Sequence, residues 1–293
     1  VRLWGWLNGF TLWGCGPAPL PAEPPKSRLR LPPLPAVVLA IIVLGCLCCD
    51  FFLPKDPAYL DLYHANTAPN AEFWFGTDTM GRDIFSMIWH GGRLSLLIGF
   101  LSTFISTAIA VLFGTAGGIA PGWLDKLLTR VAEVFLSVPS LLLVIFLQAI
   151  LGHAGVLSLS IAIGVTGWMG IAKVVRTEVR RLRESEFILA ARCMGGGFFH
   201  NLWVHFLPNI FPSILFMVVM NIRGAIAAES TLSFLGLGLP LEIISWGSML
   251  SLAERSLLSG AWWMVLIPGA FLVITLLCIT ELGEQLRQTA DRQ

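Results

Sequence analysis

The chain has 293 residues, of which 56% are hydrophobic and only 13% are charged. Ordinary globular domains have about 45–50% apolar and about 25% charged residues, so this composition excludes a soluble enzyme domain and a disordered chain. The chain has 19 Lys and Arg residues and 18 Asp and Glu residues, which gives a net charge of +1. That balance excludes a nucleic-acid binder whose affinity comes from excess basic charge. The composition predicts an integral membrane protein.

The first segment, residues 1–33, differs from the rest of the chain. Residues 1–16 are apolar and rich in Trp but too short to cross a bilayer, and a Pro-rich stretch follows them. No small-residue cleavage site follows an apolar core of the kind that a signal peptide has. We expect a cytoplasmic or interfacial segment over residues 1–33.

Uncharged stretches of about 20 residues or more, long enough to cross a membrane, recur along the remaining chain. The longest, 134–172, is too long for one helix, and its central Gly152-His153-Ala154-Gly155 predicts a turn. We therefore expect an all-α, polytopic fold with six transmembrane helices. These cover residues 34–53, 94–119, 131–151, 155–175, 209–235 and 262–282.

The segments between the spans predict the orientation. Fourteen Lys and Arg lie in segments that share a side with both termini, and four lie on the opposite side. The positive-inside rule then predicts cytoplasmic N and C termini. We expect an extracytoplasmic segment at 54–93 and a core membrane domain with five spans at 94–290. Ile84, Phe85, Ile88 and Trp89 predict an amphipathic helix in the outer segment, which contacts a partner protein or serves as a structural belt.

The chain has four lysines, Lys26, Lys55, Lys126 and Lys173, and none of them follows a glycine. A P-loop needs Gly-Lys-[Ser/Thr] to hold phosphates, so this sequence contains no such motif. We predict no catalytic residues here. If transport is driven by ATP, another chain supplies the ATPase.

The predicted cytoplasmic loop between spans four and five, residues 185–207, combines two amphipathic pieces with a turn at Gly195–Gly197. This pattern predicts a helix-turn-helix on the cytoplasmic face. The residues alone leave open an interfacial helix anchored by aromatic side chains or a docking element for a partner protein.

The loop resembles the EAA loop of ABC-transporter permeases. Ala-Ala is followed by Gly four residues later, and Leu-Pro comes twelve residues after that Gly. In that family the loop is the coupling helix, seated in a groove of the ATPase subunit. Leu189 stands where the family often has Glu. The resemblance implies coupling roles for Glu186, Leu189, Ala190, Ala191, Arg192, Gly195, Leu207 and Pro208.

Two further stretches are similar to signatures of the dipeptide/oligopeptide/nickel permease family, and the resemblance covers about residues 37–290. One runs from Phe75 to Ser86, and the other from Glu229 to Gly238 with Ser245-Trp246-Gly247 after it. The family-motif residues are Gly76, Thr77, Asp78, Gly81, Arg82, Asp83, Ser233, Phe234, Gly236, Gly238, Trp246 and Gly247.

This resemblance implies a permease of an ATP-driven importer for peptides or for nickel and other metal chelates, in the bacterial inner membrane. Its expected partners are a second homologous permease, two ABC ATPases, an extracytoplasmic binding protein and the lipid bilayer, with no nucleic acid. ATP and Mg²⁺ are expected in the ATPases, and no cofactor on this chain. The alternative is a secondary transporter driven by an ion gradient, which predicts inverted repeats that the sequence does not show convincingly.

Arg223 and Glu229 fall inside the fifth predicted span. Six residues rotate a helix by about 600°, so the two side chains are expected on different faces. A charge at that depth costs at least ~2.5–3.5 kcal/mol, and each needs an internal partner or a water-filled path. Both are therefore candidates for the translocation pathway. For Arg223, a structural ion pair with the second permease is the alternative.

Cysteine and histidine side chains gather on the predicted outer side, and they raise the question of a metal site. They are Cys46, Cys48, Cys49, His64, His90 and His153. No paired CxxC or HxxxH spacing places ligands on one helix face, and a buried free cysteine behaves as a small hydrophobe. We assign no metal ligands from the sequence.

Overall fold

The computed structural model describes residues 33–53, 56–120, 122–152, 155–186, 188, 197, 200, 202–240, 242–254, 256 and 260–290. The described residues are helical apart from turns, loops and one isolated bridge between Thr77 and Asp83, so the predicted all-α class is confirmed. Almost all of the expected 1–33 segment lies outside the described residues. The same holds for the coupling-loop candidates Leu189, Ala190, Ala191, Arg192 and Gly195.

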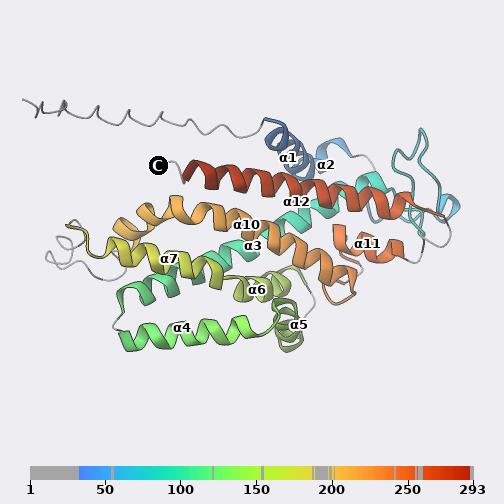
Figure 1. Cartoon of the computed structure of the whole chain (residues 1–293). Coiled ribbons are helices and arrows are strands. Elements are labelled where there is room, and N and C mark those ends of the chain that lie inside the picture. The colour runs from blue at the N-terminus through green and yellow to red at the C-terminus, as the bar shows by residue number, and fades with distance from the viewer. Residues whose placement is uncertain are drawn as a thin grey trace, which may run out of the picture.

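Three long helices pack side by side and run the length of the molecule (Figure 1). They are α3 (Ile84–Ile119), α10 (Leu207–Phe234) and α12 (Trp263–Ala290). Within the part of the chain that the structure describes, three helical stretches are long and apolar enough to cross a membrane, and up to five are if each of two bent helix pairs counts as one span. The structure therefore supports three to five spans.

Helix α3 begins where the sequence predicts an amphipathic helix, but it does not stop before the second span. It runs through His90-Gly91-Gly92-Arg93 without a break. A Cβ atom at Gly92 would lie 2.6 Å from Cys46 Sγ and from the Trp246 ring, so the glycine permits close packing here. The expected outer helix and the expected span are thus one continuous helix of 36 residues.

The third predicted span, 131–151, is wrong as a single helix. Helices α4 (Gly122–Ser137) and α5 (Ser140–Leu151) meet at an angle of 94°. Pro139 lies at the break with extended backbone torsions, φ −54° and ψ 128°. Proline has no backbone N–H and disfavours helical torsions in the residue before it, which explains the bend.

The predicted turn near residue 152 is confirmed. Helix α5 ends at Leu151, and Gly152 adopts φ 67°, a left-handed conformation that glycine tolerates. The next pair, α6 (Val156–Gly167) and α7 (Met169–Leu182), bends by 46° at Trp168. Helix α7 extends beyond the predicted span end at 175, so the arginine-rich stretch expected in the loop is helical.

The remaining elements are short. Helix α1 (Pro33–Leu47) has 15 residues and is followed by α2 (Cys49–Phe52). A single 3₁₀ turn, η1 (Leu62–His64), lies in the connection to α3, and a π-helical turn, η2 (Leu202–Phe206), precedes α10. Helix α11 (Trp246–Glu254) lies between α10 and α12. Figure 1 places the 56–83 connection and α11 toward one end of the bundle, and the C-terminal ends of α7 and α12 and the start of α10 at the other.

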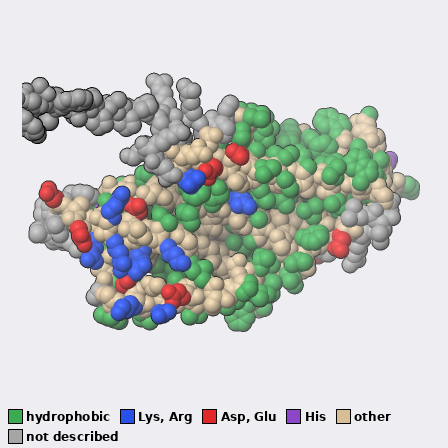
Figure 2. All heavy atoms as spheres, in the orientation of Figure 1, with side chains coloured by type: hydrophobic (Ala, Val, Ile, Leu, Met, Phe, Trp, Pro, Cys, Tyr) green, Lys and Arg blue, Asp and Glu red, His purple; other side chains and the backbone are tan. Residues whose placement is uncertain are grey.

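Helix α3 is the centre of the bundle, because it packs against α1, α6, α7 and α10. One buried cluster surrounds Trp246 and joins α1, α3, α11 and α12. A second, at the opposite end, joins α3, α7, η2 and the start of α10. Apolar side chains also cover much of the surface between the ends, while Lys and Arg gather over the α4–α7 end (Figure 2). The apolar belt and the charged end are what a bilayer-embedded bundle presents.

Candidate functional site

An acidic side chain joins α4 to α7 at the charged end of the bundle. Asp125, the first acidic residue of α4, is only 6% exposed. Its Oδ1 accepts from Arg176 Nε at 2.5 Å, and its Oδ2 accepts from Arg176 Nη2 and Arg180 Nη2, each at 2.6 Å. The planar guanidinium of Arg176 thus holds the carboxylate with two parallel hydrogen bonds, the strong form of this pair.

Close backbone packing holds α7 against α3 at the same end. A Cβ atom at Gly114 would lie 2.7 Å from the Val175 side chain, and one at Gly118 would lie 2.6 Å from Val179. Arg183, just past the end of α7, also donates to the carbonyl oxygen of Gly118 at 3.4 Å. Helix α7 is therefore attached to α3 by packing and to α4 by charge.

The segment that resembles a coupling loop begins directly after this attachment. Of its predicted residues, the structure places Glu186 on the surface, Leu207 half-buried and Pro208 exposed at the start of α10. Ile188 on one side and Phe206 on the other are fully buried in the cluster around α7. The described residues at the two flanks of the loop are thus packed against α7 and the start of α10.

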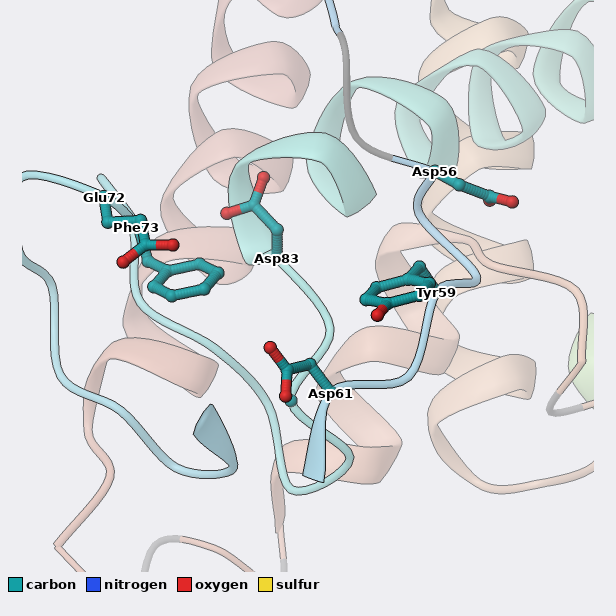
Figure 3. Close-up of a pocket in the computed structure, with 7 residues that line it drawn as sticks. Asp56, Tyr59, Asp61, Glu72, Phe73 and Asp83 are labelled. Atoms are coloured by element: carbon teal, nitrogen blue, oxygen red, sulfur yellow. The ribbon is translucent and has the colours of Figure 1, made fainter. Parts of the chain in front are cut away.

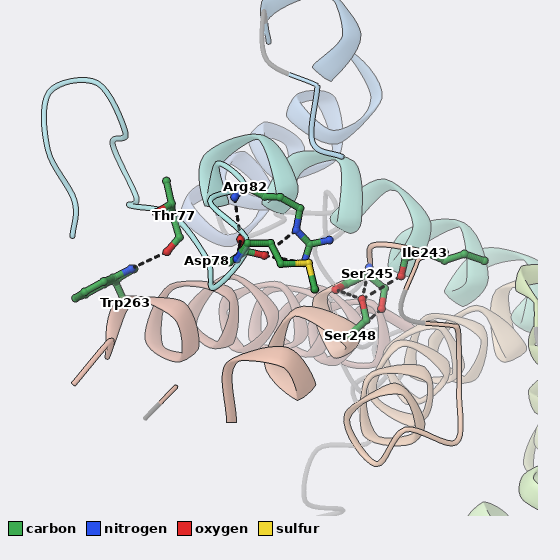
Figure 4. A network of polar contacts seen from close by, with 8 residues as sticks. Thr77, Asp78, Arg82, Ile243, Ser245, Ser248 and Trp263 are labelled. Carbon is green, nitrogen blue, oxygen red and sulfur yellow. Dashed lines mark hydrogen bonds and ion pairs between the residues drawn. The ribbon is translucent and has the colours of Figure 1, made fainter. Parts of the chain in front are cut away.

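The Gly76-to-Asp83 motif forms a tight turn at the opposite end. Asp78 Oδ1 accepts from the backbone N–H of Arg82 at 2.8 Å, and Asp78 Oδ2 accepts from Arg82 Nε at 2.7 Å (Figure 4). Both side chains are buried. Gly81 has φ 74°, and a Cβ there would lie 1.7 Å from the carbonyl oxygen of Asp61. The turn therefore needs glycine at position 81, and the Asp78–Arg82 ion pair links two of its residues.

Two residues of the same motif attach the turn to helices. Asp83 caps α3, because its Oδ2 accepts from the Ser86 N–H at 3.0 Å and from Ser86 Oγ at 2.7 Å. The carbonyl oxygen of Thr77 accepts from Trp263 Nε1 at 3.2 Å, which connects the turn to the first residue of α12 (Figure 4). The motif therefore fixes the start of α3 against the start of α12.

A pocket of about 380 Å³ opens beside this turn (Figure 3). Its lining is acidic and aromatic: Asp56, Tyr59, Asp61, Glu72, Phe73, Gly81 and Asp83. The His64 ring lies 2.7 Å from Asp61 Oδ2 and donates a hydrogen bond that holds the pKa of that carboxyl below its usual range. The pocket thus presents negative charge at neutral pH.

The second motif, Glu229 to Gly238 with Ser245-Trp246-Gly247, contains the end of α10 and the start of α11. It also packs α11 against α10. Gly236 has φ 73°, and the Leu237 N–H donates to the carbonyl oxygen of Leu232, as in a glycine-terminated helix. A Cβ at Gly247 would lie 2.7 Å from the Ser230 backbone. Trp246 is fully buried, and its Nε1 donates to the carbonyl oxygen of Ile88 at 3.0 Å. The other motif residues near this end, Ser233, Phe234 and Gly238, lie at the helix terminus and the turn that follows it.

The two charged residues of α10 lie on different faces, as predicted. Glu229 is fully buried between α10, α3 and α11, and it accepts from Ser95 Oγ at 3.0 Å, Ser230 Oγ at 3.2 Å and Ser233 Oγ at 2.9 Å. Arg223 is exposed, and no described residue forms a hydrogen bond or ion pair with it. Glu229 therefore has the internal partners that its depth requires, and Arg223 faces outward from this chain.

Sequence reasoning missed the Asp125 attachment. A signal for it was present, since Asp125 is the only acidic residue in the first turn of α4, and Arg176 and Arg180 have the i, i+4 spacing that places both on one helix face. The partner helix was not predictable, because the 94° bend between α4 and α5 determines where α4 lies.

The fold and these contacts between helices define a helical membrane protein. Its Lys and Arg side chains gather at the end where α4 and α7 meet (Figure 2). A family model described as "Binding-protein-dependent transport system inner membrane component" matches residues 110–288. The chain is 34% identical over 266 residues to the dipeptide transport system permease protein DppC of Bacillus subtilis (strain 168), covering 91% of this chain and 82% of that protein. It is also 33% identical over 257 residues to the oligopeptide transport system permease protein OppC of Haemophilus influenzae, covering 87% and 82%.

A solved structure of the MetNI methionine ABC transporter in an inward-facing conformation shares the fold, with a TM-score of 0.52 and 19% identity. The match covers 69% of this chain and 96% of that chain. The chain belongs to the family of binding-protein-dependent transport system inner membrane components. It is the permease component of an ABC transporter, located in the inner membrane and working with an ATPase and a binding protein.

Proposed function

We propose that this permease imports peptides as one half of a heterodimer with a second homologous permease. Relatives that align with most of this chain are named dipeptide and oligopeptide transport permeases, which supports peptides over nickel or metal chelates as the substrate class. ATP and Mg²⁺ are bound by two ATPase subunits, and this chain binds no cofactor for transport.

The observation that carries the coupling mechanism is the attachment of α7 to both α3 and α4 directly before the 185–207 loop. When the ATPases close on ATP, they displace the loop, and the buried flanks at Ile188 and Phe206 pass that displacement to α7 and α10. The packed helices tilt together because a close-packed interior deforms little. The central path then opens alternately to each side of the membrane.

The proposed topology has six spans, with both termini in the cytoplasm. Lys and Arg gather at the α4–α7 end, which is the end that the positive-inside rule places in the cytoplasm (Figure 2). The 56–83 connection and the acidic pocket then face outward, toward the binding protein. The first span combines α1 with α2, because the 15 residues of α1 rise only about 22 Å alone.

Arg223 is proposed to face the central path at the interface with the second permease. It is exposed on α10, and the neighbouring Gly224 leaves open space where a Cβ would lie. A cation there would attract the carboxylate of a passing peptide. Glu229 is not proposed as a path residue, because its carboxylate is buried among serine hydroxyls of this chain.

Co-purification with the partner subunits tests the proposal. We expect the chain to associate with its ATPases and to import labelled dipeptides into ATP-loaded proteoliposomes when the binding protein is present. Deleting residues 190–195 should abolish ATPase association, whereas Glu184→Gln on the exposed flank should not. Uptake that persists without ATP, or that the deletion leaves unchanged, would contradict the ABC mechanism and favour a secondary transporter.

A further inference from the structure

A cysteine, an aspartate and a histidine meet where α2 packs against the start of α3. Cys49 and Asp50 open α2, and His90 lies in the second turn of α3. One thiol sulfur, one carboxylate oxygen and one ring nitrogen from these residues lie within 4.8 Å of one another. Only tertiary packing brings them together, since the sequence separates Asp50 and His90 by a long connection. The three residue types are those that bind zinc and similar ions.

The orientation of the His90 ring directs Nε2 toward the Asp50 carboxylate. His90 Nδ1 lies 3.0 Å from the carbonyl oxygen of Ser86, which can only accept, so Nδ1 carries a proton. The other nitrogen, Nε2, lies 3.3 Å from Asp50 Oδ1. A carboxylate oxygen also only accepts. The contact therefore needs a second proton on the ring or a metal ion between the two atoms. A backbone bond at Nδ1 is the usual support of a histidine that binds metal through Nε2.

The carboxylate of Asp50 is held in a similar way. Its Oδ2 accepts from Arg93 Nη1 at 2.8 Å, which leaves Oδ1 directed toward the other two groups. Oδ1 lies 3.7 Å from Cys49 Sγ and 3.3 Å from His90 Nε2. In a tetrahedral zinc site, bonds of about 2.0 Å to N and O and about 2.3 Å to S separate the ligand atoms by about 3.3–3.5 Å. The two separations measured from Asp50 Oδ1 are close to these values, and all three ligand atoms lie within 4.8 Å of one another.

The cluster is buried on one side and open on the other. Cys49 is fully buried, whereas the Asp50 side chain is 60% exposed. An ion held by the three side chains would therefore keep a fourth position that water or another ligand can fill. The adjacent Cys48 is exposed and does not belong to the cluster, so it provides a matched control.

We propose that Cys49, Asp50 and His90 bind a divalent transition-metal ion of the zinc type. Cys49 binds as a thiolate and releases its proton to solvent, while His90 binds as a neutral imidazole through Nε2. A set of one sulfur, one nitrogen and one oxygen suits Zn²⁺ or Co²⁺ and does not suit Mg²⁺ or Ca²⁺, which prefer oxygen alone. The ion links α2 to α3 at the end of the bundle that carries the acidic pocket.

Metal titration of the purified transporter tests this site. The complex is prepared with an affinity tag that contains no histidine, stripped with a chelator and titrated with Zn²⁺ against a chromophoric indicator. We expect the wild type to bind one more Zn²⁺ ion than the Cys49→Ser complex, or to bind that ion at least tenfold more tightly. His90→Gln should give the same loss. With Co²⁺, the wild type should show a near-ultraviolet band from thiolate coordination, and Cys49→Ser should lack it.

The control variants Cys48→Ser and His64→Gln should bind Zn²⁺ as the wild type does. Asp50→Asn and His90→Gln alter side chains at the open edge of the cluster, so they keep the test valid if Cys49→Ser fails to assemble. Equal Zn²⁺ affinity in the wild type and in all cluster variants would overturn the proposal. So would a cobalt band that survives Cys49→Ser or is lost in Cys48→Ser.

Discussion

Asp125 on α4 and Arg176 on α7 form a two-point ion pair, at 2.5 and 2.6 Å, directly before the loop proposed to meet the ATPase. Arg180 adds a third hydrogen bond to the same carboxylate. The pair joins two helices that are far apart in sequence. A mutation of this pair can distinguish two effects, the assembly of the complex and the transmission of movement within it.

Replacing Asp125 with Asn should weaken the contact between α4 and α7 and leave the 185–207 loop in place. The carboxylate is mostly buried, but Arg176 and Arg180 are 31% and 46% exposed, so water screens part of the attraction. We expect a loss of about 1–3 kcal/mol in the free energy of unfolding, read as a lower thermal midpoint in detergent. ATPase association should persist, and the stimulation of ATP hydrolysis by the binding protein should fall severalfold.

Glu133→Gln is the matched control, because Glu133 also lies on α4 and pairs with an arginine, but its ion pair with Arg130 is exposed. It should change the thermal midpoint little. Suppose that both variants have the same thermal midpoint, or that the binding protein still fully stimulates ATP hydrolysis in Asp125→Asn. The ion pair between α4 and α7 then has no part in coupling.

Arg223→Gln should distinguish a path residue from a structural one. If Arg223 faces the path, the variant assembles normally and imports peptides more slowly, while Arg223→Lys keeps much of the rate because the charge remains. Assembly is measured by size-exclusion chromatography and uptake in proteoliposomes. Thr231→Ala, at another exposed position of α10, is the control. Loss of assembly in Arg223→Gln would instead indicate an ion pair with the second permease.

Gly247→Ala should destabilise the contact between α11 and α10. The added Cβ would lie 2.7 Å from the Cα and carbonyl oxygen of Ser230. These are backbone atoms, which cannot relieve the clash by a change of rotamer as a side chain can. Such overpacking costs about 1–3 kcal/mol, which the thermal midpoint of the purified complex would report. Gly269→Ala in α12 is the comparison, because its nearest neighbour, the Leu250 side chain, is 3.8 Å away. A midpoint for Gly247→Ala that matches Gly269→Ala would refute the packing account.

Glu229→Ala should cost more stability than Glu229→Gln. The alanine variant leaves the hydroxyls of Ser95 and Ser233 without their buried acceptor, a loss of about 1–3 kcal/mol. Glutamine keeps one carbonyl oxygen as an acceptor and preserves the volume. The comparison uses thermal unfolding in detergent, with peptide uptake measured in parallel. A glutamine variant that is fully stable yet inactive in uptake would show that the charge of Glu229 serves transport after all.

The helices and their ends were largely predictable, because their signals are local. Uncharged runs of about 20 residues require helices in a membrane, and Gly152 marks the end of one of them through its left-handed conformation. Asp83 was also readable as the start of a helix, since a carboxylate there can accept from the N–H groups of the first turn.

The continuity of α3 and the bend at Pro139 were harder to predict. The pair Gly91-Gly92 favours a break on local propensity, but Trp246 and Cys46 pack against Gly92 and stabilise the helix across it. Pro139 is visible in the sequence, yet a proline inside an apolar run can kink a helix slightly or end it. The surroundings decide between these outcomes.

The membrane class, the helical fold and the family could all be read from the amino-acid sequence, and its 293 residues contain no Gly-Lys-[Ser/Thr] motif. Each of these depends on composition or on residues close together along the chain. The side chains that meet across helices became visible in the packed structure: Asp125 with Arg176, Glu229 with Ser95, and Asp50 with His90. The reason is physical, because such contacts depend on the angles and offsets at which helices pack. Many side chains acting together set those angles, and no short stretch of sequence encodes them.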